Sequence, residues 1–147
     1  MAKRKPPRNR KIEKKLQETV DYIIACLKKK GIIIQRYDSY STNSIYLKLD
    51  YGVSNSIRIS DHKGKKHLSY RYNILSCCPY PVSTMDHKGF ERFYVPTNEC
   101  DVLIQKIHFD RATKMDMYGW DNYCLYMERN RQEGETKKGF WGLATLV

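Results

Sequence analysis

Several signatures that define large protein classes are absent from this chain of 147 residues. No apolar run approaches the roughly 18–20 residues that a membrane-spanning helix needs, and the first residues form no apolar signal segment. The glycine-rich phosphate loop, the HExxH zinc motif and the GxSxG serine-hydrolase motif do not occur. We therefore expect a cytoplasmic protein that contacts no membrane, and we expect it to be non-catalytic.

Cysteine is sparse, and its spacing shows no pairing. The five cysteines are Cys26, Cys77, Cys78, Cys100 and Cys124, an odd number without any C-x-x-C pair. This pattern favours separate thiols in a reducing compartment over a disulfide framework or a zinc site. Neighbouring side chains of an extended chain point in opposite directions, so Cys77 and Cys78 favour packing over shared metal or redox chemistry. We expect no metal and no other cofactor.

Acidic residues are outnumbered, and the net charge is +11. Residues 1–15 hold eight basic residues and one acid, so +7 of this charge lies there and +4 in the remainder. Residues 1–10 contain Pro6-Pro7 and no periodicity, which predicts a disordered basic arm before a single domain over 11–147. Two roles for the arm stay open. It is either a solubilising tail or a segment that contacts the phosphates of a nucleic acid.

The clearest regular pattern lies between Ser44 and Ile74. Apolar and polar residues alternate there in three runs, with turn residues at 51–52 and 61–66. Successive side chains of a strand point to opposite faces, so the pattern predicts an antiparallel meander with one apolar and one polar face. Antiparallel pairing should place four side chains together on the polar face. They are Tyr46, Lys48, Arg58 and Arg71.

Helical spacing of apolar residues occurs on both sides of the meander. It predicts an amphipathic helix over residues 11–30 that ends at Gly31. Two more helices are predicted, from Cys100 to about Met117 and from about Asp121 to Gln132. The expected fold is therefore α+β, an antiparallel β-meander of about 4–5 strands with the N-terminal helix and the two C-terminal helices packed on one face.

The apolar segment 139–147 closes a chain that is otherwise rich in charged residues. We expect it to dock on an apolar surface, because exposed apolar termini are unfavourable in water. Two surfaces qualify. One is the protein's own sheet, and the other is a neighbouring subunit, which would make the protein a homo-oligomer.

The tetrapeptide Asp-His-Lys-Gly occurs twice, at residues 61–64 and 86–89. Glycine supplies a positive φ and aspartate bonds its own turn, so the structural interpretation is two similar turns. The functional alternative is that two His-Lys tips flank one anionic pocket. Lysine beside each histidine opposes a divalent cation electrostatically, which disfavours a metal site at this pair.

The polar face of the meander and its rim carry residue types that bind nucleotides. Arginine grips phosphate through two parallel hydrogen bonds, and aromatic rings stack on bases. The candidate ligand-binding residues are Tyr46, Lys48, Arg58, Arg71, His62, Lys65, Lys66 and Arg111. The competing interpretation is a solvated sheet face with cross-strand cation–π pairs.

The stretch Ser56–His62, SIRISDH, and the following Tyr70-Arg71-Tyr72 lie between a basic helix and a helical final third. In this arrangement the chain is similar to the phage anti-Thoeris family, compact proteins that sequester cyclic ADP-ribose-type immune signals. The resemblance covers the order of elements across most of the chain and assigns no binding residue. It implies a phage or prophage counter-defence protein of the host cell cytosol. Its ligand would be a cyclic ADP-ribose-like molecule or a cyclic oligonucleotide.

Two other functions stay open. One is a nucleic-acid-binding protein or an inhibitor of a host effector, for example a CRISPR inhibitor, that uses the basic arm. The other is a small phosphodiesterase in which His62 and His87 act as general acid and base. The first predicts binding that depends on the arm, and the second predicts cleaved ligand.

Overall fold

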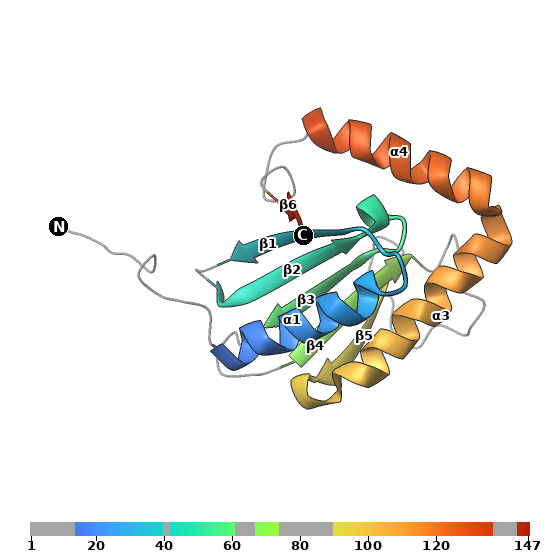
Figure 1. Cartoon of the computed structure of the whole chain (residues 1–147). Helices are drawn as coiled ribbons and strands as arrows, with labels where there is room; N and C mark the ends of the chain where they lie inside the picture. Colours follow the sequence, from blue (N-terminus) through green and yellow to red (C-terminus); the bar gives the residue numbers. More distant parts are fainter. Residues whose placement is uncertain (1–13, 40–41, 61–66, 74–89, 137–143) are drawn as a thin grey trace.

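A computed structural model describes residues 14–39, 42–60, 67–73, 90–136 and 144–147 of the chain (Figure 1). The side chains at 67, 71–73, 90–93 and 135–136 lie outside that description. In chain order the elements are α1 (Lys14–Lys28), β1 (Ile34–Ser39), β2 (Ser44–Leu49), η3 (Asp50–Gly52), β3 (Ser56–Ser60), β4 (His67–Asn73), β5 (Phe90–Pro96), η5 (Thr97–Glu99), α3 (Cys100–Tyr118), α4 (Trp120–Thr136) and β6 (Thr145–Leu146).

The strands form one antiparallel sheet in the order β5-β4-β3-β2-β1-β6. Strands β1 to β5 are a meander in which each strand pairs with the next one along the chain. The predicted α+β class is confirmed, with six strands instead of four or five. The sixth is β6, where Leu146 pairs with Gln35 and the Val147 N–H donates to the Ile34 carbonyl at 3.1 Å. The last residues of the predicted apolar segment therefore pair with the edge of their own sheet, while Leu146 and Val147 stay 61% and 42% exposed.

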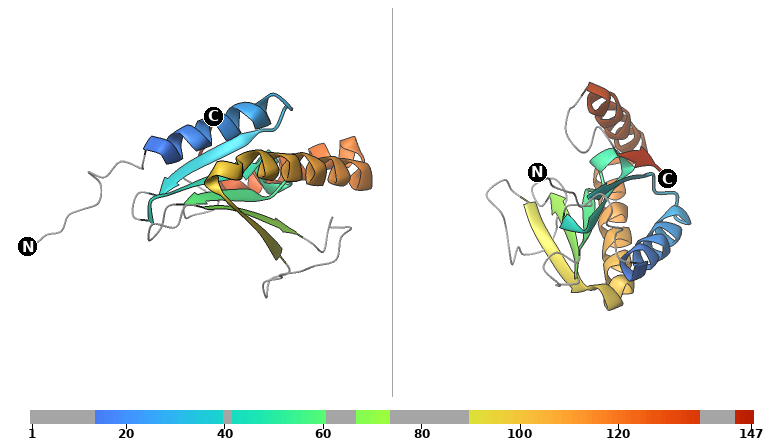
Figure 2. Two further views of the ribbon diagram at one scale, coloured as in Figure 1. Left: turned by 90° about the horizontal axis from the view of Figure 1, so that it is seen from below. Right: turned by 90° about the vertical axis from the view of Figure 1, so that its left-hand side faces the viewer.

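The core lies between the sheet and the helices α1 and α3, which cover the same face (Figure 2). Alternate residues of the central strands point into it, as the period of two predicts. The sheet contributes Ile45, Leu47, Ile57, Ile59, Leu68 and Tyr70, and the helices contribute Leu16, Val20, Ile23, Leu27, Leu103, Ile104 and Ile107. All of these side chains are buried. The predicted apolar face of the meander is thus the floor of the core.

The C-terminal helices differ slightly from their predicted bounds. Gly119, with φ +82°, separates α3 from α4, and its N–H donates to the Met115 carbonyl at 2.9 Å. The second helix continues past the predicted end at Gln132, through Gly134, to Thr136. A glycine inside an exposed helix costs only about 1 kcal/mol, which the flanking helix formers offset. No described helix is long and apolar enough to cross a membrane.

Several predictions concern residues outside the description and stay predictions. These are the basic arm at 1–10, the two Asp-His-Lys-Gly copies at 61–64 and 86–89, and the adjacent pair Cys77 and Cys78. In the described part of the chain, Cys26, Cys100 and Cys124 carry free thiols.

Candidate functional site

The sheet has a second face, which points away from α1 and α3 and which we call the open face. Its members alternate with the core residues along each strand. Those with described side chains are Gln35, Tyr37, Ser39, Ser44, Tyr46, Lys48, Ser56, Arg58, Ser60, Ser69, Tyr94, Pro96 and Leu146. Three of the predicted site residues, Tyr46, Lys48 and Arg58, are therefore on one face, as the alternation predicts.

One row of the open face is aromatic. Tyr37 pairs with Tyr46, Tyr46 with Arg58, Arg58 with Ser69, and Ser69 with Tyr94. We call these five residues the tyrosine row, which crosses the strands from β1 to β5. Tyr46 is half-buried, whereas Tyr94 is 56% exposed. The row presents ring surfaces at both sides of a central arginine.

Arg58 is held in a defined position within this row. Its Nε and Nη2 donate to Ser44 Oγ at 3.3 and 3.2 Å, and Ser44 Oγ donates to Ser60 Oγ at 3.0 Å. Both serines are fully buried. The guanidinium carbon lies 5.7 Å from the centroid of the Tyr46 ring, which is a cation–π contact. Ring and guanidinium together form a flat, positively charged surface of the kind on which bases stack.

The neighbouring row of the open face is cationic. Gln35 pairs with Lys48, Lys48 with Ser56, Ser56 with Arg71, and Arg71 with Arg92. We call these five residues the cationic row. The side chains of Arg71 and Arg92 lie outside the description, so their place rests on the strand register alone. The register puts the predicted residue Arg71 in the same row as Lys48.

Acidic residues are missing from the open-face positions of the five meander strands. The two acids of these strands are Asp38 and Glu91, which pair with Ile45 and Tyr72 and so belong to the opposite face. The open-face positions hold four cationic residues, namely Lys48, Arg58, Arg71 and Arg92. The register positions of this face therefore carry cations without carboxylates.

Three contributors to this face were not among the predicted site residues: Tyr37, Tyr94 and Arg92. Each lies on a strand next to the central three. The alternation in residues 90–95 indicates a strand there, but only the register with β4 shows that Arg92 and Tyr94 continue the two rows. Which residues of neighbouring strands share a row depends on how the strands pair, and the sequence of either strand alone does not show it.

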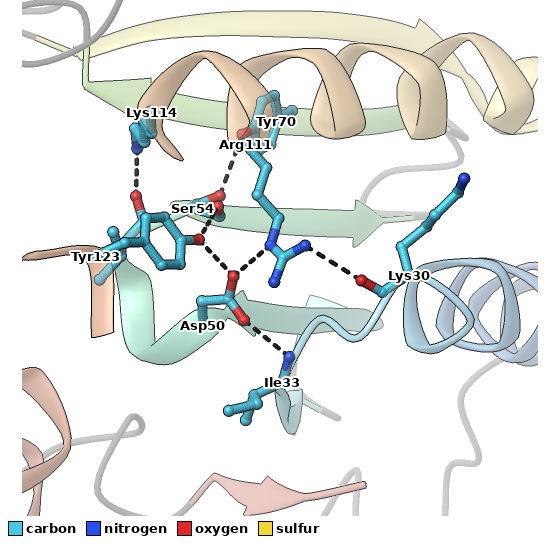
Figure 3. Close-up of polar contacts among 9 residues, drawn as sticks. Lys30, Ile33, Asp50, Ser54, Tyr70, Arg111, Lys114 and Tyr123 are labelled. Atoms are coloured by element: carbon cyan, nitrogen blue, oxygen red, sulfur yellow. Dashed lines mark hydrogen bonds and ion pairs between the residues drawn. The ribbon is translucent and has the colours of Figure 1, made fainter. Parts of the chain in front are cut away.

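Arg111, a further predicted site residue, lies elsewhere. It belongs to α3, which packs on the opposite face, and its side chain is 12% exposed. Its Nε donates to Asp50 Oδ2 at 2.6 Å, and its Nη1 donates to the Lys30 carbonyl at 3.2 Å (Figure 3). The structure therefore does not bring Arg111 together with Tyr46, Lys48 and Arg58.

The partner of Arg111 is a fully buried carboxylate. Asp50 also accepts hydrogen bonds from the Ile33 N–H at 2.9 Å and from the Tyr123 hydroxyl (Figure 3). Burial, followed by the charge of Asp50, raises the pKa of Tyr123, so the phenol stays protonated and remains a donor. Asp50 and Tyr51 have φ of +50° and +55°, a region that residues other than glycine rarely occupy. The surrounding bonds hold this turn in place.

The same cluster includes three more buried polar groups. Ser54 Oγ lies 2.7 Å from the Tyr123 hydroxyl, Tyr70 donates to the Ser54 carbonyl at 3.1 Å, and Lys114 donates to the Val53 carbonyl. We call Asp50, Ser54, Tyr70, Arg111, Lys114 and Tyr123 the Asp50 cluster. It joins the turn after β2 to α3 and α4. Its charged groups are engaged by the protein itself, which indicates a structural role.

The remaining predicted residues, His62, Lys65 and Lys66, lie outside the described residues. Within the described ranges, no group of three or more His, Cys, Asp or Glu side chains is placed to hold a metal ion. Comparison with known proteins adds no further residue. No protein-family model, curated protein or solved structure matches this chain. The resemblance to the anti-Thoeris family therefore stays a prediction, and the open face is the candidate site on its own geometry.

Proposed function

We propose that the open face binds an anionic, nucleotide-type molecule and releases it chemically unchanged. The observation that carries this proposal is the composition of the two rows, with four cationic residues, three tyrosines and no acid at the register positions. Phosphates supply the negative charge that such a face attracts, and bases supply rings that stack on tyrosine and arginine.

Arg58 is the central residue of the proposed site. Ser44 fixes its guanidinium over the Tyr46 ring before any ligand arrives. A side chain that is already ordered loses less conformational entropy when it binds, so the contact contributes more to affinity. A hydrogen bond from this guanidinium to a phosphate contributes about 1.5–3 kcal/mol. Lys48, in the next row, adds positive potential beside it.

The biological purpose that fits this site is sequestration, as the anti-Thoeris resemblance implies. A sequestering protein lowers the free concentration of a signal by mass action and needs tight binding only. A phage or prophage counter-defence role is therefore part of the proposal. The alternative interpretation is an ordinary solvated sheet face on which Arg58 and Tyr46 stabilise only each other.

One incubation tests binding and turnover together. The purified protein is dialysed against AMP, cyclic ADP-ribose and cyclic di-AMP, then denatured, and the retained nucleotides are identified by mass spectrometry. We expect at least one of the three to be retained and recovered intact. Recovery of cleaved product would support the phosphodiesterase that uses His62 and His87, and retention of none would contradict the proposed function.

A truncated protein separates this proposal from nucleic-acid binding by the basic arm. Deleting residues 1–10 should leave nucleotide affinity nearly unchanged, because the proposed contacts come from the two rows of the open face and not from the arm. Loss of binding on truncation would place the site on the arm and not on the sheet.

A further inference from the structure

We infer that the ligand of the open face is an oligonucleotide with at least two bases and two phosphates, and not a mononucleotide. This inference rests on the proposed function and specifies the class of its ligand. It follows from how the two rows are spaced across the sheet.

The tyrosine row is wider than one base. Tyr46 lies on β2 and Tyr94 on β5, so three strand spacings separate them. At roughly 4.8 Å for each spacing, their backbones are about 14 Å apart. Between them stand Arg58 and the small, buried Ser69. A single base that stacks on the Tyr46–Arg58 pair cannot also reach the exposed ring of Tyr94.

The cationic row runs beside the tyrosine row over the same strands. The two rows are two residues apart along each strand, which is roughly 7 Å. Lys48 on β2 and Arg71 on β4 hold positions two strand spacings apart, roughly 10 Å, and Arg92 follows on β5. Cationic positions this far apart match phosphates of successive nucleotides better than a single phosphate group.

Together the rows define an orientation. The bases lie over the tyrosine row, the phosphates lie over the cationic row, and the sugar–phosphate chain crosses the strands between β2 and β5. The exposed ring of Tyr94 would find no stacking partner on a closed duplex, whose bases are stacked inside and whose surface presents phosphates. The rows therefore favour unpaired nucleotides, in which ring faces are accessible. A linear oligonucleotide and a cyclic dinucleotide share this chemistry.

The test compares AMP, the linear dinucleotide pApA and cyclic di-AMP by calorimetry on the full chain. We expect at least one dinucleotide to bind at least tenfold more tightly than AMP. Its affinity should also fall with salt concentration at about twice the slope measured for AMP, because each phosphate contact releases counterions. Tighter binding of pApA would indicate a linear oligonucleotide as the ligand, and tighter binding of cyclic di-AMP would indicate a cyclic dinucleotide.

Variants at Tyr94 locate the second base. Tyr94→Ala should weaken dinucleotide binding at least fivefold and weaken AMP binding by a clearly smaller factor, because the single base of AMP uses the Tyr46–Arg58 pair. Tyr94→Phe keeps the ring and should restore dinucleotide binding. Tyr94 is 56% exposed, so neither change should unfold the protein, which a thermal melt checks.

The outcomes distinguish this inference from the proposed function. If AMP binds as tightly as both dinucleotides, or if Tyr94→Ala has no effect on them, the inference is wrong and the proposed function stands. If neither AMP nor either dinucleotide binds, the inference is wrong, and the proposed function is wrong as well when cyclic ADP-ribose is also not retained.

Discussion

At the scale of single residues, Asp50 shows how this protein accommodates a buried charge. An unpaired carboxylate in the interior is very costly, but Asp50 faces the guanidinium of Arg111 and two further donors, the Ile33 N–H and the Tyr123 hydroxyl. Removing one partner of such a pair lowers the free energy of unfolding by more than the intact pair adds to it, because the other charge stays buried without a partner.

This asymmetry predicts a strong coupling between Asp50 and Arg111. Arg111→Met should lower the free energy of unfolding by about 3–5 kcal/mol when Asp50 is present. In an Asp50→Asn background the same change should lower the free energy of unfolding much less, because no carboxylate is left without a partner. Asparagine is a suitable replacement, since it tolerates the positive φ of this position. Urea denaturation of the four proteins measures both costs. Equal costs in the two backgrounds would rule out the coupling.

The environment of His108 predicts that the stability of the protein depends on pH. Burial, then the positive charges of Lys30 and Arg111, lower the pKa of its imidazole. The unfolded chain, with a pKa of about 6.5, then binds a proton more readily than the folded protein. Stability should therefore fall as the pH is lowered through about 6.5 towards the folded pKa.

Substituting His108 isolates its contribution to this pH dependence from that of the other titratable groups. His108→Gln should flatten the decrease between pH 7 and pH 5 in urea denaturation. Lys30→Gln removes one of the two charges, so an NMR titration should show the pKa of His108 rise. An unchanged pKa in that variant would mean that Lys30 does not act on His108.

At the scale of elements, α4 depends on one anchor. Among its described side chains, Tyr123 is buried, and the others are half-buried or exposed. Packing of this kind, and not intrinsic propensity, supplies most of the stability of a helix in a protein. Tyr123 connects α4 to the Asp50 cluster through Asp50 and Ser54.

Removing that anchor should release the helix. We predict that Tyr123→Ala destabilises the protein by about 3–5 kcal/mol and increases amide hydrogen exchange throughout 120–136. Leu125→Ala is the matched control, because Leu125 is on the same helix and 64% exposed, and it should change neither quantity. Exchange in α4 that stays slow after Tyr123→Ala would show that other contacts hold it.

The elements also show what the sequence could and could not reveal. A period of two was enough to assign Tyr46, Lys48 and Arg58 to one face, because strand geometry forces alternation. The pairing of β6 with β1 depends on two residues at the far end of the chain, which carry no strand signal of their own. The hydrogen bond between Tyr123 and Asp50 joins residues 73 positions apart, and no pattern in the sequence near either residue predicts such a contact.

At the scale of the whole molecule, the two faces of the sheet differ in composition. One face, with α1 and α3, forms the apolar core, and the other holds the tyrosine row and the cationic row. The helices carry both charge signs, whereas the open-face register positions of the meander carry cations alone. The net charge alone is typical of general polyanion binders, whereas the proposal of a stacked, phosphate-bearing ligand rests on the arrangement of residues on the sheet.

The most direct test of a binding site on the open face is calorimetry with three ligands, cyclic di-AMP, pApA and AMP. Three proteins are compared: the unaltered chain, Arg58→Ala and Arg36→Ala. Arg36 is the matched control, because it is on the same sheet but pairs with Leu47 of the core face, and its side chain is 19% exposed. We predict that Arg58→Ala weakens binding about tenfold or more, the equivalent of at least 1.4 kcal/mol, and that Arg36→Ala leaves it unchanged. Affinity that survives Arg58→Ala, or falls equally in both variants, would contradict a binding site on the open face.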